Sequence, residues 1–512
     1  QGLLAFVVEV ATRFSNFAIL VQHTSQELPD EGEQRPGQDE VPGELLRLLE
    51  VTLTSSLKIA GALLQARQTE HARLKLVDWQ QFLAISNESL GQVRQVQETC
   101  KVKLRMGDSH AGTDVQAGLR AIMYNQTKSI IEEFHQKCLL QTKTVLEQER
   151  WVQTDVPVQY KHILVRMLGQ QAQQPVQTEG DTSAGSLDDQ SPQGTTERYL
   201  HVEGAHFLVV PAVLTLLQLL GDYVKLCQDF GELAAEVVQR MCMLLRLFNQ
   251  RAQRLVLNGQ AVQHQVLEKI TAANLALSSQ CCGLIAQVLP LLQTHLTEVT
   301  QASYAGSGAQ AAARVAMVSA LLGDLSKIAT EFTEHRTALF GKLSDLLQKC
   351  YTAHSKKWLG GEPHAELTSD LELWQGDGAA LAAQRGELEL GAHTSLEGLV
   401  KDITIMYRVL LKNLNFDSVR KIFARAFEDM AKKFEQRLGQ EISAPTPPYE
   451  DCVGRSLGDR LLLDLAFLQR ELEKLTGIST PLQRLLCDLV QHLQNKMPVE
   501  DSLKKLHPRV LE

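Results

Sequence analysis

Apolar residues recur every three or four positions along most of this chain, and this spacing constrains its fold more than any other feature. Four stretches show the spacing, and their apolar positions are Leu45, Leu48, Leu49, Leu53, Leu57 and Ala60; Ile122, Ile130, Phe134 and Cys138; Val237, Met241, Leu244, Leu245 and Phe248; and Val266, Ile270, Leu277, Cys281, Ile285 and Val288. This period places apolar groups on one face of a helix. Alternation with a period of two is seen at Tyr199–Val202, where we expect a short strand. We therefore predict an all-α fold, an elongated rod of stacked helical bundles with disordered linkers.

The composition supports helices and argues against several functional classes. Hydrophobic residues make up 44% of the chain but aromatic residues only 5%, so aliphatic side chains must supply the core. The formal net charge of −9 gives no general argument for nucleic-acid binding. The nine cysteines include no C-x-x-C pair, which favours free thiols in a reducing compartment. Residues 1–21 carry charges and Phe207–Leu220 is short, so we expect any membrane contact to be peripheral.

Breaks in the helical pattern divide the chain into segments. Pro- and Gly-rich or polar stretches interrupt it, and Gln1 in place of Met suggests a fragment of a longer protein. We expect 1–105 as an upstream helical bundle segment, 106–168 as a long helix with a Pro-delimited turn, 169–198 as a disordered linker, 199–300 as a helical module, 314–359 as a helical hairpin segment, 360–394 as a flexible linker, 395–440 as amphipathic helices, 441–455 as a Pro-rich loop and 456–512 as C-terminal helices.

The sequence predicts no catalytic, cofactor-binding or metal site, and hence no enzyme. The 15 histidines do not gather with cysteines or carboxylates at metal spacing, and we interpret His201 and His206 as ordinary core or rim residues. Cys281 and Cys282 are adjacent on a predicted helix, where they point to different faces, so packing is favoured over redox chemistry. The N-x-S/T matches at Asn87 and Asn125 fall in helical patterns and are interpreted as chance.

One catalytic pattern remains as an alternative. Gly454–Gly458 matches G-x-S-x-G, which would make Ser456 a hydrolase nucleophile. That motif needs a strand before the serine, whereas a Pro-rich loop precedes Ser456 here. We favour Ser456 as the N-cap of a helix that begins near Leu457.

The segment Phe416–Phe434 carries an aromatic stripe surrounded by basic residues. The stripe consists of Phe416, Val419, Phe423, Phe427, Met430 and Phe434, and the basic residues are Arg420, Lys421, Arg425, Lys432 and Lys433. One interpretation is a helix that lies on a membrane surface or in a partner's groove. We favour the other, a core helix with a solvated face.

Several strings resemble the C-terminal region of the family of vacuolar protein sorting-associated protein 54. They include Glu149-Arg150-Trp151 before Asp155-Val156-Pro157, Val202-Glu203-Gly204, Phe248-Asn249, Leu255-Val256-Leu257, Lys269-Ile270-Thr271 and Asn274–Ser279. The resemblance keeps its order over about residues 110–440. It marks 199–300 as the hallmark helical module of the family.

The resemblance implies a function that is not catalytic. It implies a subunit of the Golgi-associated retrograde protein complex, a tether for endosomal vesicles on the cytoplasmic face of the trans-Golgi network. The implied partners are sister subunits, SNAREs and Rab and Arl small GTPases, with no cofactor, and residues 199–440 would present a protein-binding surface. The alternatives are a subunit of another helical-rod tether, of the exocyst or conserved oligomeric Golgi type, and a peripheral membrane-surface protein.

Overall fold

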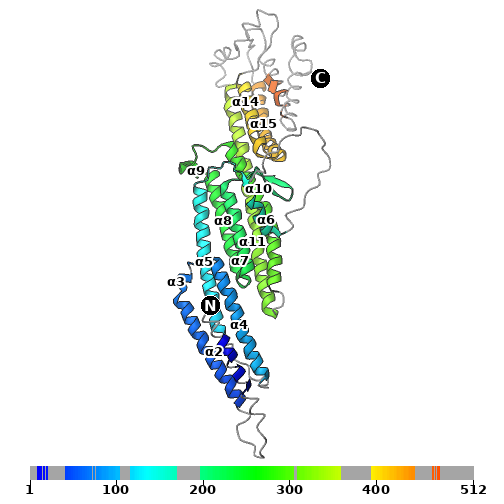
Figure 1. Cartoon of the computed structure of the whole chain (residues 1–512). Helices are drawn as coiled ribbons and strands as arrows, with labels where there is room; N and C mark the ends of the chain where they lie inside the picture. Colours follow the sequence, from blue (N-terminus) through cyan, green and yellow to red (C-terminus); the bar gives the residue numbers. More distant parts are fainter. Residues whose placement is uncertain are drawn as a thin grey trace, which may run out of the picture. The chain divides into compact units, whose positions relative to one another are not determined.

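The computed structural model confirms the all-α fold class (Figure 1). It describes residues 8–13, 15–17, 19–20, 41–71, 73–74, 76–103, 116–169, 196–304, 308–358, 394–443, 464–465, 467–468, 470–472 and 475. The helices are α2 (Val41–Ala66), α3 (Gln68–His71), α4 (Leu76–Lys103), α5 (Ala117–Glu147), α6 (Gln159–Leu168), α7 (Pro211–Asp229), α8 (Ala234–Val256), α9 (Gln260–Gln263), α10 (Ala272–Tyr304), α11 (Gly308–Trp358), α14 (Thr394–Asn413) and α15 (Phe416–Ser443), with a 3₁₀ turn η2 (Gly231–Leu233). Most of the predicted linkers at 169–198, 360–394 and 441–455, and most of 456–512, lies outside the described residues. Within these ranges Thr196–Glu197 form β2, α14 begins at Thr394 and α15 extends to Ser443.

The strands in the described part of the chain are two or three residues long. β1 (Val156–Pro157) pairs antiparallel with β2 (Thr196–Glu197), and β3 (Leu200–Val202) pairs with β4 (Ala205–Phe207). Glu203 and Gly204 join β3 to β4 and have φ values of 47° and 77°. A two-residue hairpin turn needs positive φ at both positions, which Gly adopts without steric cost. The string Val202-Glu203-Gly204 therefore encodes the hairpin turn that leads into α7.

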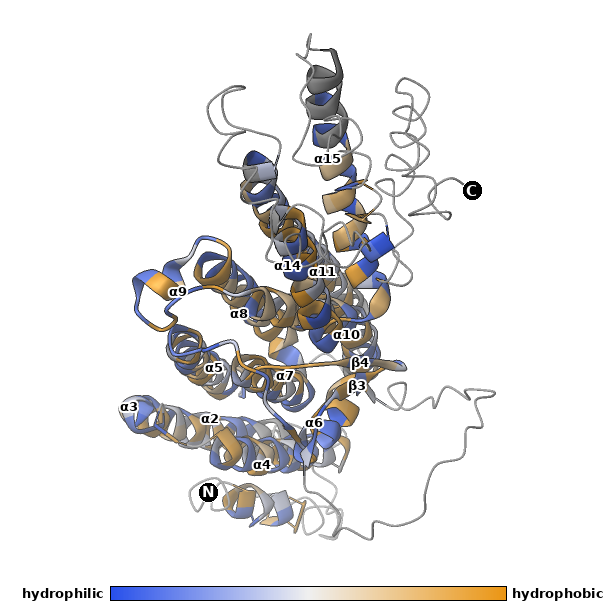
Figure 2. Ribbon diagram, turned by 90° about the horizontal axis from the view of Figure 1, so that it is seen from above, coloured by the Kyte–Doolittle hydropathy of each residue, from blue (hydrophilic) through white to orange (hydrophobic). Residues whose placement is uncertain are grey.

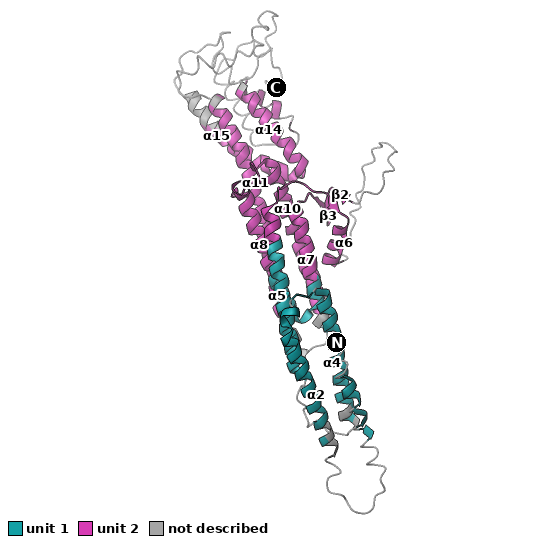
Figure 3. Ribbon diagram, turned by 60° about the vertical axis from the view of Figure 1, so that its left-hand side comes forward, with its two compact units in different colours: residues 1–141, 225–240 teal, residues 142–224, 241–512 magenta. Residues whose placement is uncertain are grey.

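The chain divides into two compact units, residues 1–141 with 225–240 and residues 142–224 with 241–512 (Figure 3). In the first unit, α2, α4 and α5 bury apolar faces, and its core is formed by Ala11, Leu49, Leu53, Leu57, Ala60, Leu90, Val93, Leu119 and Met123. Leu48 was placed on the same stripe but is 54% exposed. One residue turns a helix by about 100°, so Leu48 leaves the face that Leu49 shares with Leu53.

In the second unit, α10 and α11 form an antiparallel pair. Gln293 near the end of α10 contacts Ser326 of α11, whereas Cys282 near its start contacts His335, which lies further along α11. The two helices therefore run in opposite directions. The hairpin predicted within 314–359 is therefore wrong: α11 is one continuous helix of 51 residues, and the hairpin is made by α10 with α11. The Gly- and Ala-rich stretch 303–313 is partly helical, because α10 extends to Tyr304 and α11 begins at Gly308.

The predicted stripe from Val266 to Val288 is correct only in its second part. Leu277, Cys281, Ile285 and Val288 are at most 3% exposed on α10. Val266 precedes that helix, and its N–H donates to the carbonyl of Ala261 after the left-handed turn at Gly259. Asn258-Gly259 is a dipeptide typical of turns, and after it the chain passes through the single turn α9 before α10 starts.

The aromatic stripe of α15 faces the core of the second unit. Val419, Phe423, Phe427 and Met430 are at most 1% exposed, whereas Phe416 is 44% exposed. The five basic residues around the stripe are exposed. The core interpretation of this helix is therefore supported, with Phe416 as an exception and the Phe434 side chain outside the described residues. Figure 2 shows that α14 and α15 carry both hydrophobic and hydrophilic residues, as amphipathic helices do.

Among the described residues, one helix is long and apolar enough to cross a membrane by length and composition alone. It is α10, over Ala272–Ala302, and 78% of its most apolar window is buried inside the protein. Burial of this kind is typical of the central helix of a bundle.

Candidate functional site

The carboxylate of Glu149 connects the end of α5 to the start of α7. Its Oε2 accepts a hydrogen bond from the Ala212 N–H at 2.9 Å, and its Oε1 accepts one from the Trp151 N–H at 2.9 Å. Val210 precedes α7 and Pro211 begins it. Neither side chain has an oxygen that could accept from the free N–H groups of the first turn. Glu149 supplies the missing acceptor from 63 residues away.

Trp151 links this segment to α10 as well. Its carbonyl accepts a hydrogen bond from Asn274 Nδ2 at 3.1 Å, while its ring is buried and its φ is 52°. Asn274 also belongs to a reciprocal cap: its Oδ1 accepts from the Thr271 N–H at 2.9 Å, and its N–H donates to Thr271 Oγ1 at 3.3 Å. Glu149, Trp151 and Asn274 thus join three helices, and we call this cluster the Glu149 junction.

Burial sets the electrostatics of the junction. Glu149 is 6% exposed, and burial raises the pKa of its carboxyl above the usual range. The hydrogen bonds from Ala212 and Trp151 act in the opposite direction because they stabilise the charged form. The hydrogen bonds of the arrangement hold helix ends together, which is a structural role.

A second buried polar group lies between α8, α10 and α11. His335 Nδ1 lies 2.8 Å from Asn249 Oδ1 and 3.5 Å from Cys282 Sγ. Burial lowers the pKa of His335 to about 4 and raises the pKa of Cys282 to about 12, so both side chains are neutral near pH 7. A buried thiol of this kind is inert rather than reactive.

The sequence candidates for chemistry do not come together. Cys281 and Cys282 are both buried, with Cys281 Sγ 4.0 Å from the carbonyl of Leu208. His201 and His206 are cross-strand partners on β3 and β4 and are exposed. Ser456 lies outside the described residues.

The two N-x-S/T matches lie within helices. Asn87 is on α4 and Asn125 on α5. Thr127, the third residue of the second match, is buried, accepts from Trp79 Nε1 at 3.2 Å and donates to the Met123 carbonyl at 2.8 Å.

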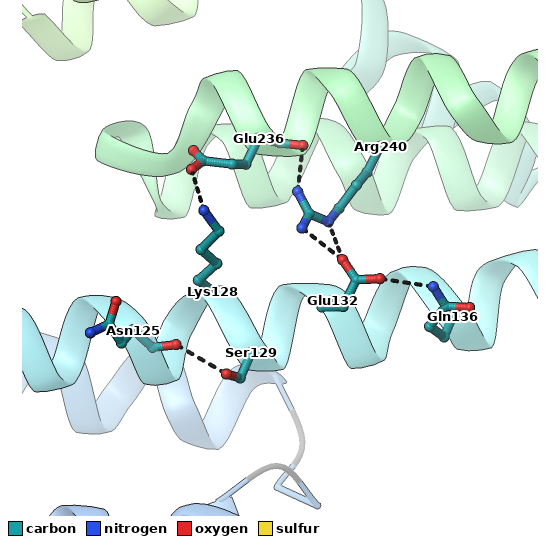
Figure 4. Close-up of polar contacts among 7 residues, drawn as sticks. All are labelled: Asn125, Lys128, Ser129, Glu132, Gln136, Glu236 and Arg240. Atoms are coloured by element: carbon teal, nitrogen blue, oxygen red, sulfur yellow. Dashed lines mark hydrogen bonds and ion pairs between the residues drawn. The ribbon is translucent and has the colours of Figure 1, made fainter.

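In the first unit, polar side chains join α5 to the start of α8 (Figure 4). Arg240 is the best buried of them, and its Nε donates to Glu132 Oε2 at 2.8 Å. Lys128 forms a more exposed pair with Glu236 at 3.2 Å. Hydrogen bonds from Gln136 and Arg240 lower the pKa of Glu132.

A cavity of about 640 Å³ opens between α4, α5 and the η2 turn of the first unit. Its lining residues are Gln80, Leu83, Ala84, Asn87, Leu90, Gly91, Arg94, Arg120, Met123, Tyr124, Thr127, Asp229, Phe230, Gly231, Glu232 and Leu233. These include neither a histidine nor a cysteine, and no general base stands beside a nucleophile. The lining suits binding better than catalysis.

The surface of the second unit includes exposed apolar side chains. On α14, Ile405 is 49% and Leu411 is 39% exposed, and Phe416 follows at the start of α15. Large apolar residues in contact with water are candidates for contacts with other proteins.

Two arrangements were missed by reasoning from the sequence. Glu149 belongs to a recognised string, but its partner Ala212 is far along the chain, so its capping role carried no local signal. Cys350, His354 and Asp402 lie together, which corrects the statement that no histidine gathers with cysteines and carboxylates. The i, i+4 spacing of Cys350 and His354 was visible, whereas Asp402 comes from another helix.

Parts of this chain are similar in sequence to known proteins. A model of the Vps54-like protein family matches residues 204–349. Vacuolar protein sorting-associated protein 54 of Rattus norvegicus is 29% identical over 177 residues, which are 35% of this chain and 17% of the relative. Vacuolar protein sorting-associated protein 54, chloroplastic, of Arabidopsis thaliana is 22% identical over 443 residues, which are 75% of this chain and 38% of the relative. Vacuolar protein sorting-associated protein 54 of Schizosaccharomyces pombe is 27% identical over 240 residues, which are 46% of this chain and 20% of the relative.

The matched segment corresponds to the helices around the Glu149 junction. It starts in the β3–β4 turn, contains α7, α8, α9 and α10, and ends within α11. Ala212 and Asn274 lie inside it, and Glu149 and Trp151 contact it from outside. Residues 204–349 of this chain are therefore similar to the Vps54-like family.

Proposed function

We propose that this chain is a non-enzymatic scaffold subunit of a multisubunit vesicle tether that acts in retrograde transport from endosomes to the trans-Golgi network. The observation that carries the proposal is the Vps54-like segment at 204–349, whose helices are joined by buried structural contacts such as the Glu149 junction. Glu149, Trp151 and Asn274, which belong to the strings that resemble the family, serve packing and capping. A helical scaffold of this kind works by holding partner proteins in place.

The proposed partners are sister tether subunits of the Golgi-associated retrograde protein complex, SNAREs, and Rab and Arl small GTPases. The proposed location is the cytoplasmic face of trans-Golgi and endosomal membranes, reached through peripheral association. The buried stripe of α15 supports attachment through partner proteins, because Phe423 and Phe427 are not available to insert into a lipid surface. The chain spans only 17% of the rat relative, so these assignments extend beyond the part of the relative that it matches.

Within residues 199–440 we propose that the exposed apolar side chains of α14 and the start of α15 contact a partner subunit. Ile405, Leu411 and Phe416 each expose more than a third of their surface. Contacts of this type bury apolar area against a partner and exclude charge.

Co-purification of the tagged chain from its own cells tests the proposal. We expect the sister subunits to be recovered, and recovery of none, with the full-length protein as a positive control, would contradict complex membership. The triple variant Ile405→Asp, Leu411→Asp, Phe416→Asp should reduce recovery. Ile59→Asp is the matched control, because Ile59 is 57% exposed on α2 of the other unit. Unchanged recovery in the triple variant would reject this surface while leaving membership intact.

A further inference from the structure

Three potential metal ligands lie together where α14 packs on α11. Cys350 and His354 are one helical turn apart on α11, and Asp402 is on α14. Asp402 Oδ2 lies 3.0 Å from His354 Nε2 and 3.4 Å from Cys350 Sγ. The ligand atoms of the three residues all lie within 4.8 Å of one another.

The two separations measured from Asp402 Oδ2 are close to those of a zinc coordination polyhedron. Tetrahedral Zn²⁺ with bonds of about 2.3 Å to sulfur and 2.0 to 2.2 Å to nitrogen and oxygen has ligand–ligand separations of roughly 3.3–3.6 Å. The contacts of Asp402 with Cys350 and His354 are within a few tenths of an ångström of this range. A metal ion would therefore need only small side-chain movements to bind all three residues.

The donor set also selects the metal. A thiolate and an imidazole favour Zn²⁺ over Mg²⁺ or Ca²⁺, which prefer oxygen ligands. The His354 side chain is 23% exposed and that of Asp402 is 50% exposed, so solvent and ions reach the cluster. A Cys and a His separated by three residues on one helix present both donor atoms on the same face.

A glycine makes room for the imidazole. A Cβ at position 398 of α14 would lie 2.8 Å from His354 Cε1, which is too close for an ordinary contact. Gly398 lies one turn before Asp402, so the absence of its side chain allows His354 to lie against α14 beside the carboxylate. A glycine inside a helix costs about 1 kcal/mol of helix stability relative to alanine. Helix formation therefore gives no reason for a glycine at position 398, whereas the packing of His354 does.

We propose that Cys350, His354 and Asp402 bind a single Zn²⁺ ion, which joins α14 to α11 and keeps a fourth position open to water. On binding, the Cys350 thiol releases its proton to solvent and the thiolate forms the bond to zinc, while the imidazole is neutral and the carboxylate already ionised. The site is independent of tether membership, because its ligands belong to one chain.

Metal titration of the purified chain tests the site. The chain is stripped with a chelator and titrated with Zn²⁺ by calorimetry and with Co²⁺ by absorption spectroscopy. We expect a single Zn²⁺ per chain at this site and a thiolate-to-cobalt charge-transfer band, which Cys350→Ser should abolish. Asp402→Asn should weaken Zn²⁺ binding by at least about tenfold. Asp345→Asn is the matched control, because Asp345 is exposed on the same helix α11.

A non-ligand variant keeps the test decisive if Cys350→Ser fails to fold. Gly398→Ala retains all three ligands but displaces His354, so it should weaken Zn²⁺ binding while circular dichroism stays unchanged. Zn²⁺ affinity and Co²⁺ spectra that are unaltered in Asp402→Asn and Gly398→Ala would overturn the proposal. So would Zn²⁺ binding that is absent from the folded wild-type chain.

Discussion

The Glu149 carboxylate accepts a hydrogen bond from the N–H of Ala212, which lies 63 residues further along the chain, and so caps the helix α7 that begins at Pro211. The acceptor comes from the end of α5 because Val210 and Pro211 have no side-chain oxygen to offer α7. This contact joins the string Glu149-Arg150-Trp151 to the Vps54-like segment. It gives that string a physical role that is independent of catalysis.

Glu149→Ala should lower the free energy of unfolding by about 2–3 kcal/mol, because it removes a cap and leaves buried N–H groups without an acceptor. Chemical denaturation monitored by circular dichroism measures the change. Glu147→Ala is the control two residues earlier. Glu147 forms a part-exposed ion pair with Arg251 at 3.5 Å, and its loss should cost less than about 1 kcal/mol. Equal losses in the two variants would contradict the capping role.

Leu277→Gln should destabilise the second unit by about 3–5 kcal/mol. Leu277 is 3% exposed on α10, so the variant loses apolar packing and buries an amide without a partner. Leu63→Gln, at a position that is 51% exposed on α2, makes the same chemical change at the surface and should have little effect. A melting temperature of Leu277→Gln within error of the wild type would show that this face of α10 is not core.

Acidification from pH 7 towards pH 4 should reduce stability through His335. Its pKa is about 4 in the folded chain, against 6.5 for an ordinary histidine. Between these values the unfolded chain binds a proton and the folded chain does not, so the free energy of unfolding falls as the pH falls, by on the order of 3 kcal/mol. The contribution is complete above the unfolded pKa and is lost as the pH approaches the folded one.

Variants separate this effect from that of the acidic groups, which also titrate in this range. His335→Gln should be less stable at pH 7 but should lose less stability between pH 7 and pH 4.5 than the wild type. His264→Gln, at an exposed histidine, should follow the wild-type pH profile. A His335→Gln profile parallel to the wild type would mean that folding does not lower the pKa of His335.

The two ion pairs of Figure 4 should differ in strength. The Arg240 side chain is 14% exposed and lies 2.6 Å from Glu132, whereas Lys128 is 48% exposed and lies 3.2 Å from Glu236. Double-mutant cycles to alanine should give a coupling of about 1–2 kcal/mol for Arg240 with Glu132 and below about 0.5 kcal/mol for Lys128 with Glu236. Added salt should weaken the second pair more. A larger coupling for the Lys128 pair would refute this ranking.

Local signals in the sequence were sufficient where one helix or one turn decided the outcome. Pro211 begins α7, Gly259 provides the left-handed turn after α8, and Leu277 lies in the core as its spacing predicted. The errors came where a pattern ran past a boundary. Val266 has the spacing of the α10 stripe but precedes the helix, because the cap formed by Thr271 and Asn274 fixes where α10 begins.

The candidate sites depended on contacts between distant segments. The i, i+4 spacing of Cys350 and His354 was a weak sequence signal for a pair of metal ligands. Nothing in the sequence distinguished Asp402 from the other acidic residues, because only the packing of α14 against α11 places it beside them. In the same way, Asn274 was recognised as part of a family string, yet its bond to the Trp151 carbonyl spans 123 residues.

The sequence by itself determined that this chain forms amphipathic helices and the face that most of them bury, because helical periodicity is a local property of the chain. Only the tertiary structure decided which helix ends share a buried carboxylate, where His335 loses its proton affinity and which acid faces Cys350 and His354. Those outcomes depend on burial and on pairs of atoms from segments far apart in the chain, and neither quantity is encoded in the spacing of residues along one helix.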